Sequence, residues 1–191
     1  MNQNLLIIGA GIYGLVAQEI AESMGCFLRI DFVDDGEKET PNGMPVIGTT
    51  QDLPVLSKEY ANVVVAIGNP EFRQRLIRFI EEETLLRLVT LVSPKAYVSP
   101  SAQIGKGCIV EPMAVIHTGC LLGKGCLICA GAVVNHRAMC GDCVQVDCNA
   151  VIPGNTVVLS GIKAAAGTVY ETKTSRGAAA DHQQVRLEED V

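Results

Sequence analysis

The chain contains three histidines, His117, His136 and His182, whose side chains change charge near neutral pH. A neutral imidazole can remove a proton from a hydroxyl or ammonium group, and the freed nucleophile can attack a thioester carbonyl. The resulting oxyanion needs N–H donors, which an exposed backbone edge can supply. His182 lies in a polar stretch and is a poor candidate. His117 is more simply interpreted as a solvent-facing side chain, although it remains the second choice after His136.

A glycine-rich stretch, Gly9-x-Gly11-x-x-Gly14, follows the first apolar run. Between a strand and a helix, this spacing lets a diphosphate approach the backbone at the helix N-terminus. Asp34 and Asp35 end the next apolar run, where a carboxylate can accept hydrogen bonds from ribose hydroxyls or base N–H groups. The alternatives are a tight strand–helix turn and two solvated carboxylates. Because the unit is half the size of a full dinucleotide fold, we expect a mononucleotide or nucleotide-sugar site.

Eight cysteines include two C-x-x-C spacings, Cys126 with Cys129 and Cys140 with Cys143, which are typical of zinc sites. These four residues occupy different phases of the six-residue repeat described next, so they are not expected to converge on one ion. Buried thiols acting as small hydrophobes explain most of them. The sequence therefore predicts no metal site, and a cytosolic setting disfavours disulfides.

The stretch 92–162 repeats every six residues. From Ile104, ten apolar residues recur in register: Ile104, Val110, Ile116, Leu122, Ile128, Val134, Cys140, Val146, Ile152 and Val158. The fourth residue after each is usually small, and the third is Gly or Asn in seven of the ten repeats. This period fits neither a helix nor a plain strand, but it is the signature of a parallel β-helix with left-handed corners. We expect about four coils of three faces each. Residues from about 92 to 160 should contain no long helix, and a helix of three turns between Ile104 and Ile152 would refute this.

The region before the repeat alternates strands and helices. Strands are expected at 4–8, 27–33, 63–67 and 86–91, helices at 15–24 and 71–83, and a polar connection at 37–60. This order predicts a parallel sheet in a Rossmann-like βαβ domain. The expected domains are therefore 1–91, the α/β nucleotide-sugar-binding domain; 92–174, the all-β parallel β-helix; and 175–191, a polar tail.

The net charge and the hydropathy of the chain exclude two classes of partner. The net charge is −6 over 191 residues, with no cluster of Lys and Arg, so no nucleic-acid partner is expected. No apolar run reaches membrane-spanning length and no cleavable leader opens the chain, so we expect no membrane partner and a cytoplasmic location.

These motifs together resemble the NeuD/PglD family of sugar O- and N-acetyltransferases. The resemblance rests on Gly9-Ala10-Gly11-x-x-Gly14, 32–35 (Phe-Val-Asp-Asp), 45–48 (Pro-Val-Ile-Gly), 65–69 (Val-Ala-Ile-Gly-Asn) and the hexapeptides, over residues 4–174. It implies a left-handed β-helix, a homotrimer, and transfer of acetyl from acetyl-CoA to an amino or hydroxyl group of a nucleotide-linked sugar or sialic acid.

The resemblance also implies roles for single residues. His136 matches the catalytic base, and Gln145 stands where relatives have a second histidine that contacts acetyl-CoA. The implied substrate-binding residues match Gly11, Ile12 and Tyr13 at the diphosphate, Asp34 and Asp35 at the nucleoside, and Gly68.

Some positions depart from the family pattern. Arg137 follows His136 where relatives have an acidic residue, so an orienting carboxylate would have to come from Asp142 or Asp147. Tyr13 stands where many members have histidine. The alternative function is therefore a weakened or inactive relative that binds a nucleotide-sugar or acts as a scaffold.

Residues directly before the core positions should face outward. Val115, Leu121, Leu127 and Val133 would form exposed apolar stripes on a narrow solenoid, and such stripes imply partner surfaces. This pattern, with the family resemblance, predicts association into a homotrimer.

Overall fold

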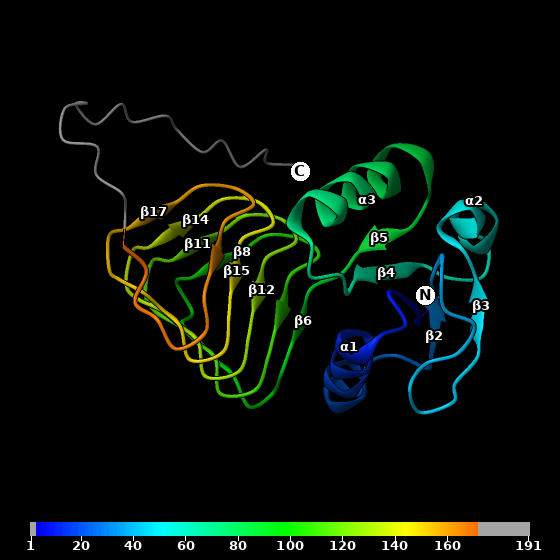
Figure 1. Ribbon diagram of the computed structural model, residues 1–191, viewed down its shortest axis with the longest axis horizontal. Coiled ribbons are helices and arrows are strands. Elements are labelled where there is room, and N and C mark those ends of the chain that lie inside the picture. Colours follow the sequence, from blue (N-terminus) through cyan, green and yellow to red (C-terminus); the bar gives the residue numbers. More distant parts are fainter. Residues whose placement is uncertain (1–2, 172–191) are drawn as a thin grey trace.

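The computed structural model describes residues 3–171 as an α/β domain followed directly by a solenoid of short strands (Figure 1). The predicted polar tail and His182 lie outside the described residues. No helix within 3–171 has the length and apolar character needed to cross a membrane.

The N-terminal domain is a five-stranded parallel sheet in the order β3-β2-β1-β4-β5. Its strands are β1 (Asn4–Ile8), β2 (Arg29–Val33), β3 (Val46–Gly48), β4 (Asn62–Val65) and β5 (Arg87–Leu88). The helices are α1 (Ile12–Met24), the single turns η1 (Thr50–Asp52) and α2 (Leu53–Leu56), and α3 (Pro70–Glu83). The central strands β1 and β4 are buried almost throughout, as their unbroken apolar sequences require.

Two details of the predicted elements differ. The connection 37–60 contains an edge strand, β3, which pairs in parallel with β2 through Phe32 and Val46. The single strand expected at 86–91 is instead two strands, because Leu88 pairs with Val63 of the sheet whereas Leu91 pairs with Ile109 of the solenoid. The chain therefore passes from one domain to the other within two residues, without a linker.

The solenoid is a left-handed parallel β-helix with three flat faces, which confirms the predicted fold class. The β6 face contains β6 (Leu91–Val92), β9 (Ile109–Val110), β12 (Leu127–Ile128), β15 (Gln145–Val146) and β18 (Lys163–Ala164). The β7 face contains β7 (Tyr97–Val98), β10 (Val115–Ile116), β13 (Val133–Val134) and β16 (Val151–Ile152). The β8 face contains β8 (Gln103–Ile104), β11 (Leu121–Leu122), β14 (Met139–Cys140) and β17 (Val157–Val158).

Strands eighteen residues apart pair in register throughout, as in Val115 with Val133 and Val133 with Val151. The apolar positions of the repeat and the small residues four places later line one continuous interior. No helix occurs between Ile104 and Ile152, as the repeat predicted.

Every corner of the solenoid from residue 107 onward places one residue in the left-handed region. Six of these are glycines: Gly107, Gly119, Gly125, Gly131, Gly161 and Gly167. Five are not glycine: Met113, Arg137, Cys143, Asn149 and Asn155. The corner geometry is thus imposed by the coil even where the residue type disfavours it.

The β6 face packs against the N-terminal domain. Ile109 and Leu127 share a core cluster with Leu5, Ile7 and residues of α1. The prediction that Leu127 is exposed was wrong, since it is 1% accessible. The other three predicted outward residues are only half-buried, because their faces carry no second domain.

Candidate functional site

His136 lies at the corner after β13, with its imidazole exposed. Its backbone N–H donates to Asn135 Oδ1 over 2.8 Å, and its ring Nδ1 lies 2.9 Å from the same oxygen. An atom that accepts from a backbone N–H cannot be the amide nitrogen, so the ring Nδ1 must be the donor. Nε2 then keeps its lone pair, which is the form that a general base requires.

The His136 ring packs against the next coil of the solenoid. A Cβ added at Gly154, on the next coil, would lie 2.6 Å from both Nε2 and Cε1 of His136, so the imidazole packs over a position that only glycine leaves open. The side chain of Arg137 lies instead over Gly119 of the preceding coil. His117 is also exposed, one coil before Asn135.

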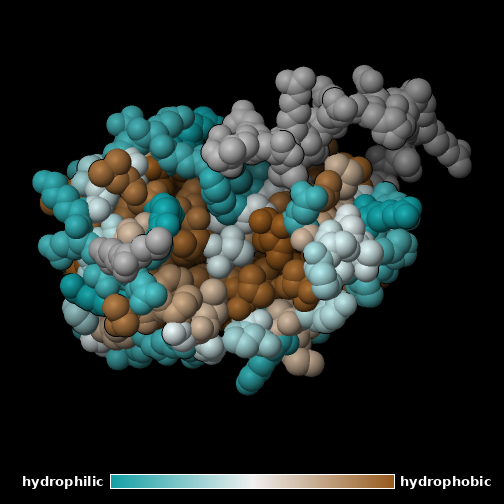
Figure 2. Space-filling view, turned by 180° about the vertical axis from the view of Figure 1, so that it is seen from behind, coloured by the Kyte–Doolittle hydropathy of each residue, from teal (hydrophilic) through white to brown (hydrophobic). Residues whose placement is uncertain are grey.

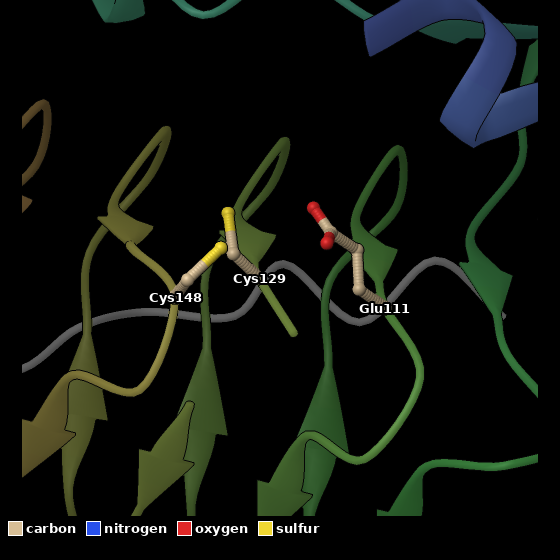
Figure 3. Close-up of side chains that lie close together, drawn as sticks. All are labelled: Glu111, Cys129 and Cys148. Carbon is tan, nitrogen blue, oxygen red and sulfur yellow. The ribbon is translucent and has the colours of Figure 1, made fainter. Parts of the chain in front are cut away.

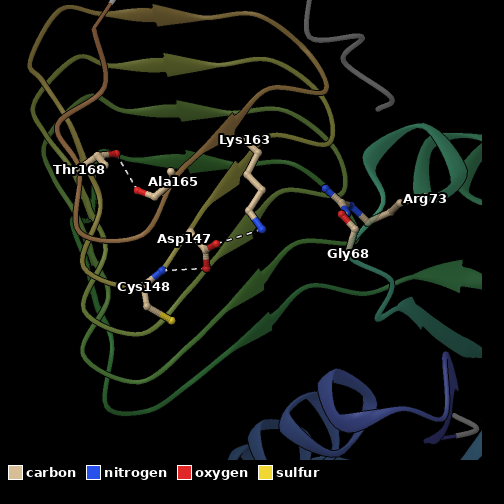
Figure 4. Close-up of polar contacts among 7 residues, drawn as sticks. All are labelled: Gly68, Arg73, Asp147, Cys148, Lys163, Ala165 and Thr168. Atoms are coloured by element: carbon tan, nitrogen blue, oxygen red, sulfur yellow. Dashed lines mark hydrogen bonds and ion pairs between the residues drawn. The ribbon is translucent and has the colours of Figure 1, made fainter.

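The carboxylate expected to orient His136 is not one of the two named from the sequence. Asp142 accepts from the backbone N–H of Lys124. Asp147 forms an ion pair with Lys163 at 3.0 Å and accepts from the backbone N–H of Cys148 (Figure 4). The neutral amide of Asn135 takes the orienting position, because it is the residue adjacent in the chain whose side chain folds back onto the ring.

The glycine-rich loop is built around close backbone approaches. Gly9 has φ +111° and a Cβ there would lie 2.7 Å from the carbonyl oxygen of Ala66. A Cβ at Gly14 would lie 2.0 Å from the carbonyl oxygen of Gly9. Gly11 differs, since no atom of residues 3–171 lies within 4 Å of an added Cβ. It begins α1, a helix with no side-chain cap and no acidic residue in its first turn, so the N-terminal N–H groups face an open surface.

Asp34 is part of the same loop. Its Oδ2 accepts from the N–H of Ala10, and its Oδ1 accepts from the N–H groups of Gly36 and Glu37. Burial by itself would raise the pKa of Asp34, but the three N–H donors outweigh burial and lower the pKa below its ordinary value.

Asp35 turns the other way and accepts from the N–H and hydroxyl of Thr50. In the structure both carboxylates therefore hold loops, and their contact with a nucleoside stays a prediction.

Ile12 and Tyr13 point in different directions. Ile12 is 69% exposed beside Gly11, as a ligand-contacting residue would be. The hydroxyl oxygen of Tyr13 is buried and makes no hydrogen bond of full geometry with any residue in 3–171. Burial raises the pKa of Tyr13 well above its ordinary value, and the nearby Cys129 and Glu111 raise it further. The Tyr13 side chain thus faces the solenoid.

Gly68 lies open, because none of the described residues has an atom within 4 Å of an added Cβ. Its carbonyl accepts from Arg73, which sequence reasoning missed. Arg73 is 0% accessible and lies beside Gly68 (Figure 4). Its guanidinium donates to the carbonyls of Ile67 and Gly68 in its own domain, at 2.6 and 3.1 Å, and to those of Gly125 and Cys143 in the solenoid, at 2.8 and 2.7 Å. The Arg73 side chain therefore links the turn at Gly68 to two coils of the solenoid. An arginine amid the apolar positions of α3 was the available signal.

Gln145 occupies β15 and is buried between Leu127 and Lys163 of neighbouring strands. It therefore lies on the β6 face, whereas His136 lies at the corner between the other two faces. The glycine-rich loop and Gly68 belong to the domain that covers the β6 face. A single chain therefore places its candidate base and its candidate nucleotide site on opposite sides of the coil.

The two C-x-x-C spacings do not assemble a site. Cys126 faces the interior and its thiol donates to the carbonyl of Gly141. Burial raises the pKa of Cys140 and that of Cys143, the latter to about 11, so these thiols stay protonated. Within 3–171, possible metal-ligand side chains gather in one place, at Glu111, Cys129 and Cys148.

Known protein families match both the N-terminal domain and the solenoid. The PglD N-terminal domain matches residues 4–80, and the bacterial transferase hexapeptide of six repeats matches residues 101–136. A search of curated proteins finds no match.

Two solved structures are similar over nearly the whole length. The acetyltransferase domain of PglB from Neisseria gonorrhoeae FA1090, in complex with acetyl coenzyme A, is 33% identical with a TM-score of 0.80, covering 90% of this chain and 92% of that one. A histidine-to-asparagine mutant of perosamine N-acetyltransferase from Caulobacter crescentus, in complex with CoA and GDP-perosamine, is 26% identical with a TM-score of 0.64, covering 87% and 90%. With its α/β domain, its hexapeptide solenoid and this likeness, the chain belongs to the NeuD/PglD family of acetyl-CoA-dependent sugar acetyltransferases.

Proposed function

We propose that the protein transfers the acetyl group of acetyl-CoA to the amino group of a nucleotide-linked sugar, with His136 as general base. The observation that carries the proposal is the hydrogen bond between His136 Nδ1 and Asn135 Oδ1, which leaves Nε2 free to accept a proton. An amino acceptor is favoured over a hydroxyl because the similar perosamine enzyme is an N-acetyltransferase.

In this mechanism the neutral sugar amine attacks the thioester carbonyl, and Nε2 of His136 takes the proton that the attacking nitrogen loses. The C–S bond then breaks, the proton held by His136 passes to the sulfur, and coenzyme A leaves as the thiol. Backbone N–H groups at the coil corners are suited to stabilise the oxyanion. Asn135 is a positioning residue, since it fixes the tautomer without adding charge.

The nucleotide-sugar is proposed to bind at the carboxyl edge of the N-terminal sheet. The open Gly11 and the uncapped N-terminus of α1 suit a diphosphate, because helix N–H groups there attract anions. Gly68 and Ile12 border the same edge, and Asp34 and Asp35 would meet the nucleoside. Gln145 is proposed as the acetyl-CoA contact.

A homotrimer would bring the separated parts together. In the proposed assembly the base of one chain meets the nucleotide-sugar held by its neighbour, and acetyl-CoA lies between adjacent solenoids. Hydrophobic surface suited to such packing runs across the rear of the molecule and is bordered by polar side chains (Figure 2). Half-buried Val115, Leu121 and Val133 belong to the uncovered faces of the solenoid.

The test is acetyl transfer from acetyl-CoA to UDP-linked and GDP-linked amino sugars, measured as coenzyme A release. We expect His136→Ala to lower kcat by roughly 10²–10⁴ without loss of nucleotide-sugar binding. His117→Ala is the matched control, since it removes an exposed histidine one coil earlier. No transfer by the wild type would favour the binding or scaffold function, and loss of activity in His117→Ala alone would reassign the base.

The Asn135→Asp variant tests whether Asn135 orients His136 or only contributes to the structure of the corner. A carboxylate beside Nδ1 would stabilise the protonated form of the ring, the imidazolium. Since the base must be neutral, the acid limb of the kcat profile should move to higher pH in this variant. An unmoved limb would show that Asn135 does not orient the base.

A further inference from the structure

Three ligand-type side chains converge at the corners that follow the β6 face (Figure 3). The carboxylate of Glu111 and the thiols of Cys129 and Cys148 lie within 4.8 Å of one another. Cys129 stands one coil after Glu111, and Cys148 stands one coil and one residue after Cys129. They therefore come from three successive coils, a spacing unrelated to the C-x-x-C pairs.

A fourth polar group reaches the cluster from the other domain. Tyr13, in the first turn of α1, buries its hydroxyl beside Cys129 and Glu111. Within 3–171 the hydroxyl makes no hydrogen bond of full geometry, although the Glu111 carboxylate lies close enough to help raise the pKa of Tyr13. A buried hydroxyl without a partner costs about 1–3 kcal/mol, so native proteins rarely leave one unless something else satisfies it.

The charges around the cluster favour a cation. Glu111 and Cys129 are both buried, and one Glu111 oxygen accepts from the N–H of Ala130. The salt bridges found within 3–171 do not include Glu111. Lys163 pairs with Asp147, and the buried Arg73, whose charge acts on Tyr13, donates to backbone carbonyls instead. Burying a carboxylate without a counter-charge is unfavourable.

We propose that Glu111, Cys129, Cys148 and the hydroxyl of Tyr13 bind a zinc ion. Two sulfur and two oxygen donors number four, which is the coordination that zinc prefers, and thiolates disfavour magnesium and calcium. On binding, the two thiols lose their protons to solvent and form two Zn–S bonds. Cys148 is exposed, so the ion can enter from that side. All four positions would be filled by protein, as in structural zinc sites.

Such an ion would join the two domains at a second point. Tyr13 belongs to the glycine-rich loop and helix α1, whereas the other three ligands belong to the solenoid. Arg73 of α3 already connects the two domains, through its bonds to the solenoid corners that precede the β6 face. A zinc ion would connect α1 to the solenoid corners that follow the β6 face. The inference does not depend on the proposed base or acceptor.

The test is metal analysis of the reduced full-length chain after incubation with zinc and dialysis. We expect one zinc per chain, and cobalt in its place should give the visible absorption of a thiolate-bound tetrahedral ion. Cys148→Ala should weaken zinc binding at least roughly 100-fold. Loss of a residue that only hydrogen-bonds to a metal ligand costs up to about that factor, and loss of the ligand itself should cost no less. Tyr13→Phe should weaken it less and shift the cobalt spectrum.

Cys26→Ser is the matched control, because Cys26 is an exposed cysteine of the N-terminal domain outside the cluster. The Cys148 variant alters an exposed side chain, so misfolding is not expected to mask the result. A reduced wild-type chain that takes up no zinc would overturn the proposal. Zinc retained unchanged in Cys148→Ala would also overturn it, as would a Cys129–Cys148 disulfide in a chain that binds no metal when reduced.

Discussion

Arg73→Met should strongly destabilise the protein while preserving the volume of the buried side chain. Four backbone carbonyls would lose their donor. At about 1–3 kcal/mol for each buried group left unsatisfied, the gross loss is large. Removing a buried cation returns several kcal/mol. We therefore expect a net loss of about 4 kcal/mol, or a decrease of roughly 10 °C in Tm for a chain of this size.

Chemical and thermal unfolding would measure this loss. Arg78→Ala, an exposed arginine on the same helix, is the control and should change stability by less than about 0.5 kcal/mol. Arg73→Lys should recover little, because an ammonium lacks the planar fork that reaches both domains. A loss below about 1 kcal/mol in Arg73→Met would refute the view that these four bonds hold the junction together.

Three further predictions test the local geometry. Arg137→Gly should raise the free energy of unfolding by about 1 kcal/mol, because Arg137 has φ +56° at a corner that suits glycine; no rise in Tm would contradict this. Gly14→Ala should lower Tm markedly, since its Cβ would meet the carbonyl of Gly9, whereas Gly11→Ala should change Tm little; equal losses would contradict the distinction. Asp34→Asn should be less stable than wild type at neutral pH. Because the folded-state pKa of Asp34 is lowered, its contribution is fully present above the unfolded pKa of about 3.9 and is lost as pH falls through the folded pKa. Urea titrations from pH 7 down to pH 3 should therefore show the two chains converging, and a constant gap would refute the assignment.

The solenoid could be predicted from sequence because its period is set by backbone geometry. Once Ile104 begins the register, each later core position is fixed, and the structure keeps it as far as Val158. The corners depend on the coil more than on residue type, which is why Arg137 takes a conformation that glycine usually provides.

The junction could not be predicted in the same way. The repeat does not say which of three equivalent faces another domain covers, so Leu127 looked like an exposed residue. Arg73 gives no local sign that its partners are carbonyls of Gly125 and Cys143, far away in the chain.

The candidate sites were predicted in part. His136 follows from the repeat and from family resemblance, but its orientation by Asn135 depends on a side-chain rotation that sequence does not encode. Adding eighteen residues to Glu111 gives Cys129, but adding eighteen more gives Asp147, so the repeat points to only part of the Glu111, Cys129 and Cys148 cluster. The C-x-x-C pairs instead drew attention to residues within one coil, where the side chains point in different directions.

The absence of a linker has a consequence for substrate choice. Val89 still bonds to Val63 of the sheet, and Leu91 already bonds to Cys108 of the solenoid. With no hinge between them, the two domains cannot close around a ligand as hinged enzymes do. In the proposed assembly, the span from the nucleoside to the reacting nitrogen would be fixed in advance. The protein would then select substrates by the distance between the diphosphate and the amino group of the sugar. Similar sugars in which this distance is shorter or longer would be rejected.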